Sequence, residues 1–339
     1  MTTLHTAAAA VVLLFAGSFS TCHAEVPASE RVSIPEVAVI KAILKQPESE
    51  MDFGKIKLTI DKMIDPTINV DAGLKQIDGI VIQIRGMLRS NPSSNDKLLA
   101  LKRYLYEKGP WNGYEVFRYD LDDPRGTKIS NKLLPNYLAS KKGNCVSMPL
   151  LFIILGQRLG LDVTASTAPE HVFVKYTDSD TGITYSLEAT SGASPARDVW
   201  LRQQNPMTDE AVANGIYLQK LTKRETAAVM ATTLSENFSV RHEPEKMIAI
   251  ADAVLPYYPK SVSLILAKGS AYAKLMKNHF ISKYPMPKDI PTEKQPYFQH
   301  LSKQNEFWYA KAEALGWRQP DMMQESRYLQ AVSRAKSIQ

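Results

Sequence analysis

The stretch Gly143-Asn144-Cys145-Val146-Ser147-Met148-Pro149-Leu150-Leu151-Phe152-Ile153-Ile154-Leu155 runs from small polar residues straight into an apolar segment of helical length. Proline is tolerated in the first turn of a helix, and Gly160 stands where a C-cap glycine is common, so the pattern predicts a helix from Cys145 to Leu159. Because this helix is apolar over most of its surface, we expect it to be central to the core. A thiol at its start is favoured as thiolate, since free N–H groups stabilise negative charge.

Two strand-like stretches follow, joined by the polar loop Thr177–Gly182, which is of hairpin type. Their apolar positions are Val172, Val174 and Tyr176 in the first stretch and Ile183, Tyr185 and Leu187 in the second. Pairing Val172 with Leu187 makes all three facing pairs apolar, and the same register sets His171 opposite Glu188. Directly opposed side chains lie about 5 Å apart at Cβ. The hairpin therefore predicts an imidazole beside a carboxylate on its second face.

Cysteine, histidine and a carboxylate, in that order, are typical of a thiol nucleophile with its base and its orienting acid. We interpret Cys145, His171 and Glu188 in these roles, with the backbone N–H of Cys145 and one side-chain amide as oxyanion donors. The alternatives are a buried structural thiol, a satisfied histidine and a solvated strand carboxylate. Three further histidines lack metal-ligand spacing, and no glycine-rich phosphate loop is present, so no metal or cofactor is expected. These are His242, His279 and His300.

The first residues have the pattern of an export signal. The apolar run Ala7–Gly17 is too short to span a bilayer and has the length of a signal-peptide core. Small residues at Cys22 and Ala24 match the positions that signal peptidase reads, so we interpret residues 1–24 as a signal peptide and expect a periplasmic or secreted protein. An uncleaved membrane anchor is the alternative. Cleavage leaves Cys145 as the only cysteine, which rules out an intramolecular disulfide.

Bulk composition limits the classes of partner. The chain has 339 residues, enough for two modest domains, with 44% hydrophobic and 22% charged residues. Its net charge is +6 and its pI about 9.0, but the basic residues are dispersed and no basic run is interleaved with aromatic residues. We therefore expect no nucleic-acid partner.

Helical patterns surround the central segment on both sides. The expected helices lie at 37–44, at 74–87 with Asp71 as N-cap, at 98–106, at 131–140, and after Pro206 at 208–235, 242–257, 261–277 and 307–317. Helix pairs punctuated by proline favour a degenerate helical repeat after residue 205, with an irregular helical tail as the alternative.

Several of these pieces together carry a family resemblance. They are Asn131, Leu134, Leu138, Gly143–Ser147, Arg158–Leu161, Glu170–Val174 and Leu187–Thr190. The chain resembles the bacterial branch of the transglutaminase-like superfamily over most of residues 65–200. That resemblance implies a papain-like α+β core, with a nucleophile helix packed on an antiparallel sheet, preceded by a helical leader and followed by an all-α, tetratricopeptide-like tail. It implies the domains 25–64 (leader and helix), 65–205 (transglutaminase-like) and 206–339 (helical tail).

Carried over residue by residue, the resemblance makes Cys145 the nucleophile, His171 the base and Glu188 the acid, where the superfamily usually has an aspartate. It places Asn131 near the thiol as a candidate oxyanion donor. The expected function is an exported cysteine acyl-transfer enzyme, which hydrolyses amide bonds of a protein or peptide through a Cys145 thioester or transfers the acyl group to an amine. Hydrolysis is favoured because water is always present.

The alternative is a non-catalytic scaffold with a vestigial triad and a recognition surface on the helical tail. In either case we expect a protein or peptide partner, a further protein partner on the tail, and no integral membrane segment after signal cleavage.

Overall fold

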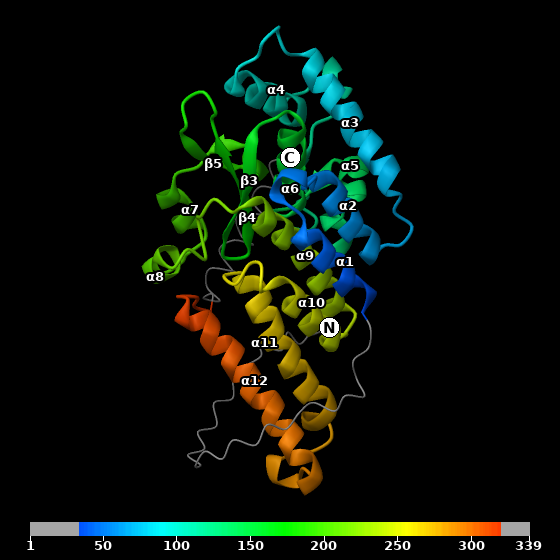
Figure 1. The fold of residues 1–339 in the computed structure, drawn as a ribbon, viewed down its shortest axis with the longest axis vertical. Coiled ribbons are helices and arrows are strands. Elements are labelled where there is room, and N and C mark those ends of the chain that lie inside the picture. Colours follow the sequence, from blue (N-terminus) through cyan, green and yellow to red (C-terminus); the bar gives the residue numbers. More distant parts are fainter. Residues whose placement is uncertain (1–33, 320–339) are drawn as a thin grey trace. The chain divides into compact units, whose positions relative to one another are not determined.

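The computed structural model describes residues 34–319, which combine helices with a small antiparallel sheet (Figure 1). The chain therefore has the expected α+β class. The predicted signal peptide and Cys22 lie outside the described residues. Within residues 34–319, no helix is long and apolar enough to cross a membrane.

The elements follow one another in this order. The helices are α1 (Pro35–Lys45), α2 (Phe53–Ile64), α3 (Val70–Gly86), α4 (Ser94–Tyr106), α5 (Leu134–Ser140), α6 (Ser147–Arg158), α7 (Asp198–Gln204), α8 (Asp209–Ala213), α9 (Lys223–Val240), α10 (Pro244–Val254), α11 (Val262–Met276) and α12 (Gln295–Ala314). The strands are β1 (Arg118–Tyr119), β2 (Lys142–Gly143), β3 (Asp162–Ala168), β4 (His171–Thr177), β5 (Thr184–Glu188) and β6 (Ser194–Pro195). The prediction that Asp71 is the N-cap of α3 is wrong. The N-cap is Asn69, whose side-chain oxygen accepts the N–H of Ala72.

Helix α6 is the centre of the core, as its apolar sequence predicted. Every residue from Ser147 to Gly156 is buried, and the helix packs against β3 and β4. A Cβ added at Gly156 would lie 2.7 Å from Val163 Cγ2, so glycine allows the helix to approach the strand closely. Gly160 has φ +74°, the left-handed conformation expected of a C-cap glycine.

The four-stranded sheet has the order β3-β4-β5-β6, with every pair antiparallel. The predicted β4–β5 register is wrong by two residues, because Val174 rather than Val172 faces Leu187. The loop accounts for the shift: Asp178 N–H donates to Ile183 C=O and Gly182 N–H donates to Asp178 C=O, which sets Thr177 opposite Thr184. A shift of two residues keeps every side chain on its predicted face, so His171 and Glu188 still share one face.

The outer edge of β3 is covered by the segment that precedes α9. The N–H of Leu218 donates to the Thr167 carbonyl, and the N–H of Leu221 donates to the Ala165 carbonyl. The helix predicted over 208–235 is therefore wrong in its middle, where Gly215 at φ +72° ends α8 and the chain turns extended along β3. Helix α9 then begins at a capping box formed by Thr222 and Glu225.

Helix α9 joins the C-terminal helices to the sheet. It is buried along most of its length, and it packs against α2, β3, α10 and α11. Residues 34–319 accordingly belong to one compact unit. The boundary after residue 205 stays a prediction, and so does the tetratricopeptide-like character of the tail.

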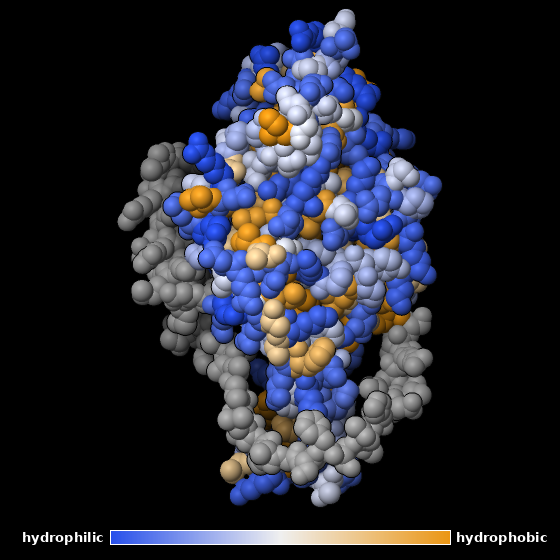
Figure 2. All heavy atoms as spheres, turned by 60° about the vertical axis from the view of Figure 1, so that its left-hand side comes forward, coloured by the Kyte–Doolittle hydropathy of each residue, from blue (hydrophilic) through white to orange (hydrophobic). Residues whose placement is uncertain are grey.

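Helices α10, α11 and α12 pack against one another in sequence, and they end in a small aromatic cluster of their own. A π-helical turn at Lys277–Ile281 puts Phe280 into that cluster. The face shown in Figure 2 is mainly hydrophilic, with small hydrophobic groups between the polar ones. Scattered exposed apolar residues of this kind are normal on protein surfaces.

Candidate active site

The loop before α6 presents the thiol. β1 and β2 pair in parallel, which fixes the chain up to Gly143. The side-chain oxygen of Asn144 then accepts the N–H groups of Val146 and Ser147 at 3.0 and 3.1 Å. The backbone N–H of Asn144 donates to Ser147 Oγ. This turn leaves Cys145 half-buried, two residues before the first helical position. Among the described residues, no acceptor takes the backbone N–H of Cys145.

The imidazole and the carboxylate meet at the ends of two neighbouring strands. His171 opens β4 and Glu188 closes β5, and the distance from His171 Nε2 to Glu188 Oε2 is 2.7 Å. The second carboxylate oxygen accepts the N–H of Thr190 at 3.0 Å and its hydroxyl at 2.6 Å. Both oxygens of Glu188 are therefore occupied, and the carboxylate has one orientation from which to hold the ring.

The thiol of Cys145 lies near the imidazole of His171, because Cys145 is among the groups that raise the pKa of His171. Since Glu188 occupies Nε2, Nδ1 is the ring nitrogen left for the thiol. The Cys145 Sγ also lies 3.7 Å from the carbonyl oxygen of Glu170. Glu170 has φ +54°, a left-handed turn between β3 and β4 that brings this carbonyl to the thiol. Cysteine, histidine and glutamate thus lie together in one site, with the histidine bonded to the glutamate.

The negative charges of Glu188 and Cys145 stabilise the imidazolium form of His171. Burial by itself would lower the pKa of His171, but the hydrogen bonds and charges of Cys145 and Glu188 raise that pKa from 6.5 to about 10. Burial would likewise raise the pKa of Glu188, but the bonds and charge of His171, together with the Thr190 donors, lower it. At neutral pH the site therefore holds a charged histidine between two acidic partners.

The side chain of Asn131 bonds to two aspartates in the loop after β1. Its side-chain amide nitrogen donates to Asp120 Oδ2 and to Asp123 Oδ2, each at 2.9 Å. Both amide hydrogens are thus directed at carboxylates, and neither is free for an oxyanion in this arrangement. The amide ties the acidic loop that follows β1 to the turn before α5. Its role as oxyanion donor stays a prediction, while the unpaired N–H of Cys145 is the donor that the geometry favours.

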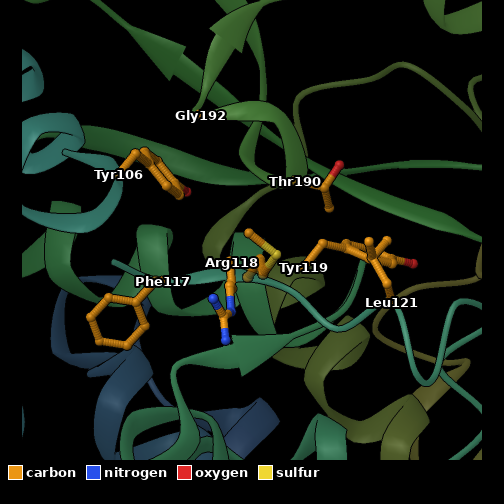
Figure 3. Close-up of a pocket in the computed structure, with 8 residues that line it drawn as sticks. Tyr106, Phe117, Arg118, Tyr119, Leu121, Thr190 and Gly192 are labelled. Atoms are coloured by element: carbon orange, nitrogen blue, oxygen red, sulfur yellow. The ribbon is translucent and has the colours of Figure 1, made fainter. Parts of the chain in front are cut away.

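A cavity of about 340 Å³ adjoins the site, because one of its lining residues, Thr190, is bonded to Glu188; Figure 3 shows the lining residues. Its lining residues are Tyr106, Phe117, Arg118, Tyr119, Leu121, Met148, Thr190 and Gly192. Sequence reasoning missed both the cavity and the second support of Glu188. The only sequence signal for that support was a threonine two residues after the acid, a spacing at which hydroxyls bond back to nearby groups. Within residues 34–319, no group of three or more His, Cys, Asp or Glu side chains could hold a metal ion.

Comparison with known proteins gives one match. A family model described as the transglutaminase-like superfamily matches residues 71–232, just under half of the chain. The matched region contains Asn131, Cys145, His171 and Glu188, and it ends inside α9. Its end agrees with the packing of α9 on the sheet. Neither the curated proteins nor the solved structures yielded a match.

Proposed function

We propose that this protein is a cysteine acyl-transfer enzyme that hydrolyses amide bonds of a protein or peptide. One observation carries the proposal: a half-buried thiol, Cys145, lies beside the imidazole of His171, which is bonded to Glu188. The match of residues 71–232 to the transglutaminase-like superfamily supports the same chemistry.

The first half of the reaction follows from this geometry. The Cys145 sulfur attacks the carbonyl carbon of the amide, a C–S bond forms, and the carbonyl electron pair moves onto oxygen. The N–H of Cys145 stabilises that oxyanion. When the oxyanion collapses, the C–N bond breaks, and His171 gives its Nδ1 proton to the leaving amine. Glu188 keeps the ring oriented and balances its charge while it holds the proton.

The second half resolves the thioester. His171, now neutral, takes a proton from water as the water oxygen attacks the thioester carbon. The C–S bond breaks, the carboxylic acid leaves, and the proton on His171 again pairs with the Cys145 thiolate. An amine in place of water would give transamidation by the same steps. We propose hydrolysis because water at high concentration is always available to the half-exposed thiol.

Export is part of the proposal, on the basis of the apolar run in residues 1–24. It would place the enzyme in the periplasm or outside the cell, with Cys145 as its only thiol. The N-terminal residue of the protein recovered from its producing cell tests this directly. A mature chain that begins at Glu25 supports export, and an N-terminus at Met1 contradicts cleavage.

The reactivity of the thiol tests the chemistry. We expect iodoacetamide to label Cys145 rapidly at pH 6, where an unassisted thiol of pKa about 8.5 is only about 0.3% ionised. His171→Ala should slow the labelling on the order of 100-fold, because the imidazolium that favours the thiolate is lost. Mass spectrometry of the intact protein measures both rates.

His242→Ala is the matched control, since this histidine lies in the turn before α10 and should leave the rate unchanged. A folded protein whose Cys145 reacts no faster than a free thiol would contradict the enzyme. That result would favour the non-catalytic scaffold.

A further inference from the structure

The cavity beside the candidate triad has no role in the steps above. It is formed between the C-terminal end of α4, β1 with its flanking residues, α6 and the turn after β5. Thr190 in its wall is bonded to Glu188, and Met148 lies in the first turn of α6, three residues after Cys145. A group bound in this cavity would therefore lie close to the candidate catalytic residues.

Arg118 is the one charged residue among those that line the cavity (Figure 3). Its side chain is exposed, so the guanidinium can meet a ligand that arrives from solvent. Arginine presents a planar fork of N–H donors that matches the two oxygens of a carboxylate. The cavity therefore offers an accessible cation with the geometry for an oxyanion of this kind.

A second cation lies beside Arg118. Strands β1 and β2 pair in parallel with Arg118 opposite Lys142, so the two side chains lie on the same face of this short sheet. Neighbouring strands are about 4.8 Å apart. Lys142 is half-buried, and the chain reaches Cys145 three residues later. The two positive charges repel each other, and an anion bound beside both would relieve that repulsion.

The acids around this pair of cations are engaged elsewhere. Within residues 34–319, neither Arg118 nor Lys142 forms an ion pair or a hydrogen bond through its side chain. Glu115 pairs with Lys141 instead, and Asp120 accepts the side-chain amide of Asn131. Among the described residues, the two cations thus keep their charge available for a ligand.

The acid of the candidate triad does not neutralise the cations either. The Glu188 side chain is only 6% exposed, and its oxygens are occupied by His171 and Thr190. Its charge is balanced by the imidazolium that it holds. The positive field at the cavity therefore comes from the two cations on β1 and β2.

We propose that Arg118, supported by Lys142, binds a carboxylate of the substrate within reach of Cys145. The inference rests on the proposed function, and it narrows the substrate class to amides that carry a carboxylate near the scissile bond. That carboxylate is either an acidic side chain or the end of a peptide chain. Arg118 is then a specificity-determining residue, and Lys142 adds to the same positive field.

Alkylation of Cys145 in the full chain by two reagents of different charge tests the site. Iodoacetate carries a carboxylate next to its reacting carbon, whereas iodoacetamide is neutral and similar in shape. The ratio of their rates cancels changes in the nucleophilicity of the thiol, which affect both reagents. We expect Arg118→Gln to lower the iodoacetate-to-iodoacetamide ratio about 2- to 5-fold, the size of one exposed ion pair, and Lys142→Gln to lower it less.

Two further variants separate the charge from other effects of the substitution. Arg118→Lys keeps the charge and should keep most of the wild-type ratio, which a purely structural role of the side chain would not do. Lys303→Gln removes one exposed positive charge from α12 and should leave the ratio unchanged. A ratio that Arg118→Gln does not lower, or that Lys303→Gln lowers as far, would overturn the subsite.

Protection of Cys145 from iodoacetamide identifies the source of the carboxylate. The competitors are N-acetylglutamate α-amide with a side-chain carboxylate, N-acetylglutamine with a chain-end carboxylate, and the neutral N-acetylglutamine α-amide. We expect at least one carboxylate to protect more strongly than the neutral compound, and the difference to disappear in Arg118→Gln. The more protective of the two names the source, and equal protection by both supports the shared chemistry. Protection by neither beyond that of the neutral compound contradicts the subsite.

The iodoacetamide rate of the same wild-type sample reports the proposed function separately. A slow thiol whose rate ratio still depends on Arg118 leaves the anion site standing and removes the acyl transfer. A fast thiol whose rate ratio is independent of Arg118 does the reverse.

Discussion

Two buried cation–carboxylate pairs in this fold have opposite designs. Lys57 and Asp61 pair on α2 with side chains only 1% and 0% exposed, whereas the His171 and Glu188 side chains are 14% and 6% exposed. Lys57 also donates to the Lys132 carbonyl at 2.8 Å, and Asp61 accepts the N–H of Leu134 at 2.7 Å. In the first pair, which we call the closed pair, both side chains are shielded from solvent and bond to backbone groups. In the second, the open pair, one ring nitrogen of His171 is left for the half-buried thiol of Cys145.

The titration behaviour of the two acids reflects this difference. Burial raises the pKa of Asp61, and its bonds and charge from Lys57 only partly oppose that rise. Burial acts in the same direction on Glu188, but there His171 and Thr190 outweigh it and lower the pKa. The closed pair anchors the backbone before α5, but the burial of its charged groups costs free energy. The open pair stabilises its charges, as the proposed acyl transfer requires.

Breaking the closed pair should give the largest effect on stability. Asp61→Leu leaves the Lys57 ammonium buried without its partner, so we expect a loss of about 3–5 kcal/mol in the free energy of unfolding. Urea titration followed by circular dichroism measures it. Glu107→Gln in the exposed Arg103–Glu107 pair is the control, with an expected change within about 0.5 kcal/mol.

A second variant separates the buried charge from the lost hydrogen bonds. Lys57→Met combined with Asp61→Leu removes both charges and should recover part of the loss, although the backbone groups of Lys132 and Leu134 stay unpaired. If Asp61→Leu costs no more than the surface control, the pair does not anchor this part of the fold.

Neutralising the acid of the open pair should change titration more than stability. We expect Glu188→Gln to lower the pKa of His171 from about 10 toward its ordinary value of 6.5, because one hydrogen-bonded negative charge is removed. NMR of the imidazole carbon-bound protons follows that titration, with His171→Gln used for assignment. Asp198→Asn, whose carboxylate lies near Lys175 instead, should leave the titration of His171 unchanged.

The same shift fixes a sign for stability. Because the folded-state pKa of His171 is raised, its contribution is fully present below pH 6.5 and is lost as pH rises through about 10. The contribution of Glu188, whose pKa is lowered, is present above pH 4.5 and is lost as pH falls through the folded-state value. The unfolding free energy of Glu188→Gln should therefore fall less than that of the wild type between pH 6.5 and 10. An equal fall would contradict the coupling.

The smallest of the three effects should come from Thr190→Val. The change removes the hydroxyl donor at 2.6 Å from Glu188 Oε1 and keeps the backbone N–H donor at 3.0 Å. We expect a loss of about 1.5 kcal/mol in the free energy of unfolding and a few-fold slower labelling of Cys145. Thr184→Val, at the opposite end of β5, is the matched control, because it removes an exposed hydroxyl bonded to Thr177 Oγ1 at 2.9 Å. No difference between the two variants would show that the hydroxyl does not support the acid.

The sequence predicted the faces of the hairpin better than its register. Alternation alone put His171 and Glu188 on one face, since face depends only on whether positions are odd or even. Register depends on the loop, and the bond between Gly182 and Asp178 has no counterpart in the apolar pattern. The helix that follows Cys145 was predictable because ten successive buried residues leave a clear apolar run.

Long-range polar contacts were beyond reach of the sequence. Asn131 bonds to Asp120 and Asp123 across a loop, and many other partners would fit the same composition. The segment along β3 was hidden for a different reason. Residues 208–235 carry a helical composition, and backbone pairing with a strand leaves no side-chain pattern to reveal it.

That segment has a consequence for how the chain is made. Residues 143–188, which carry the thiol, base and acid, emerge early from the ribosome, but the outer edge of β3 has no partner until residues 216–221 follow. The contact between β3 and α9 forms only after that helix, which ends at Val240, has been made. Until those residues are made, the edge of β3 is unpaired, and an unpaired strand edge is a template for aggregation. A cleavage or a premature stop between residues 205 and 240 would leave every candidate catalytic residue present and the fold unfinished.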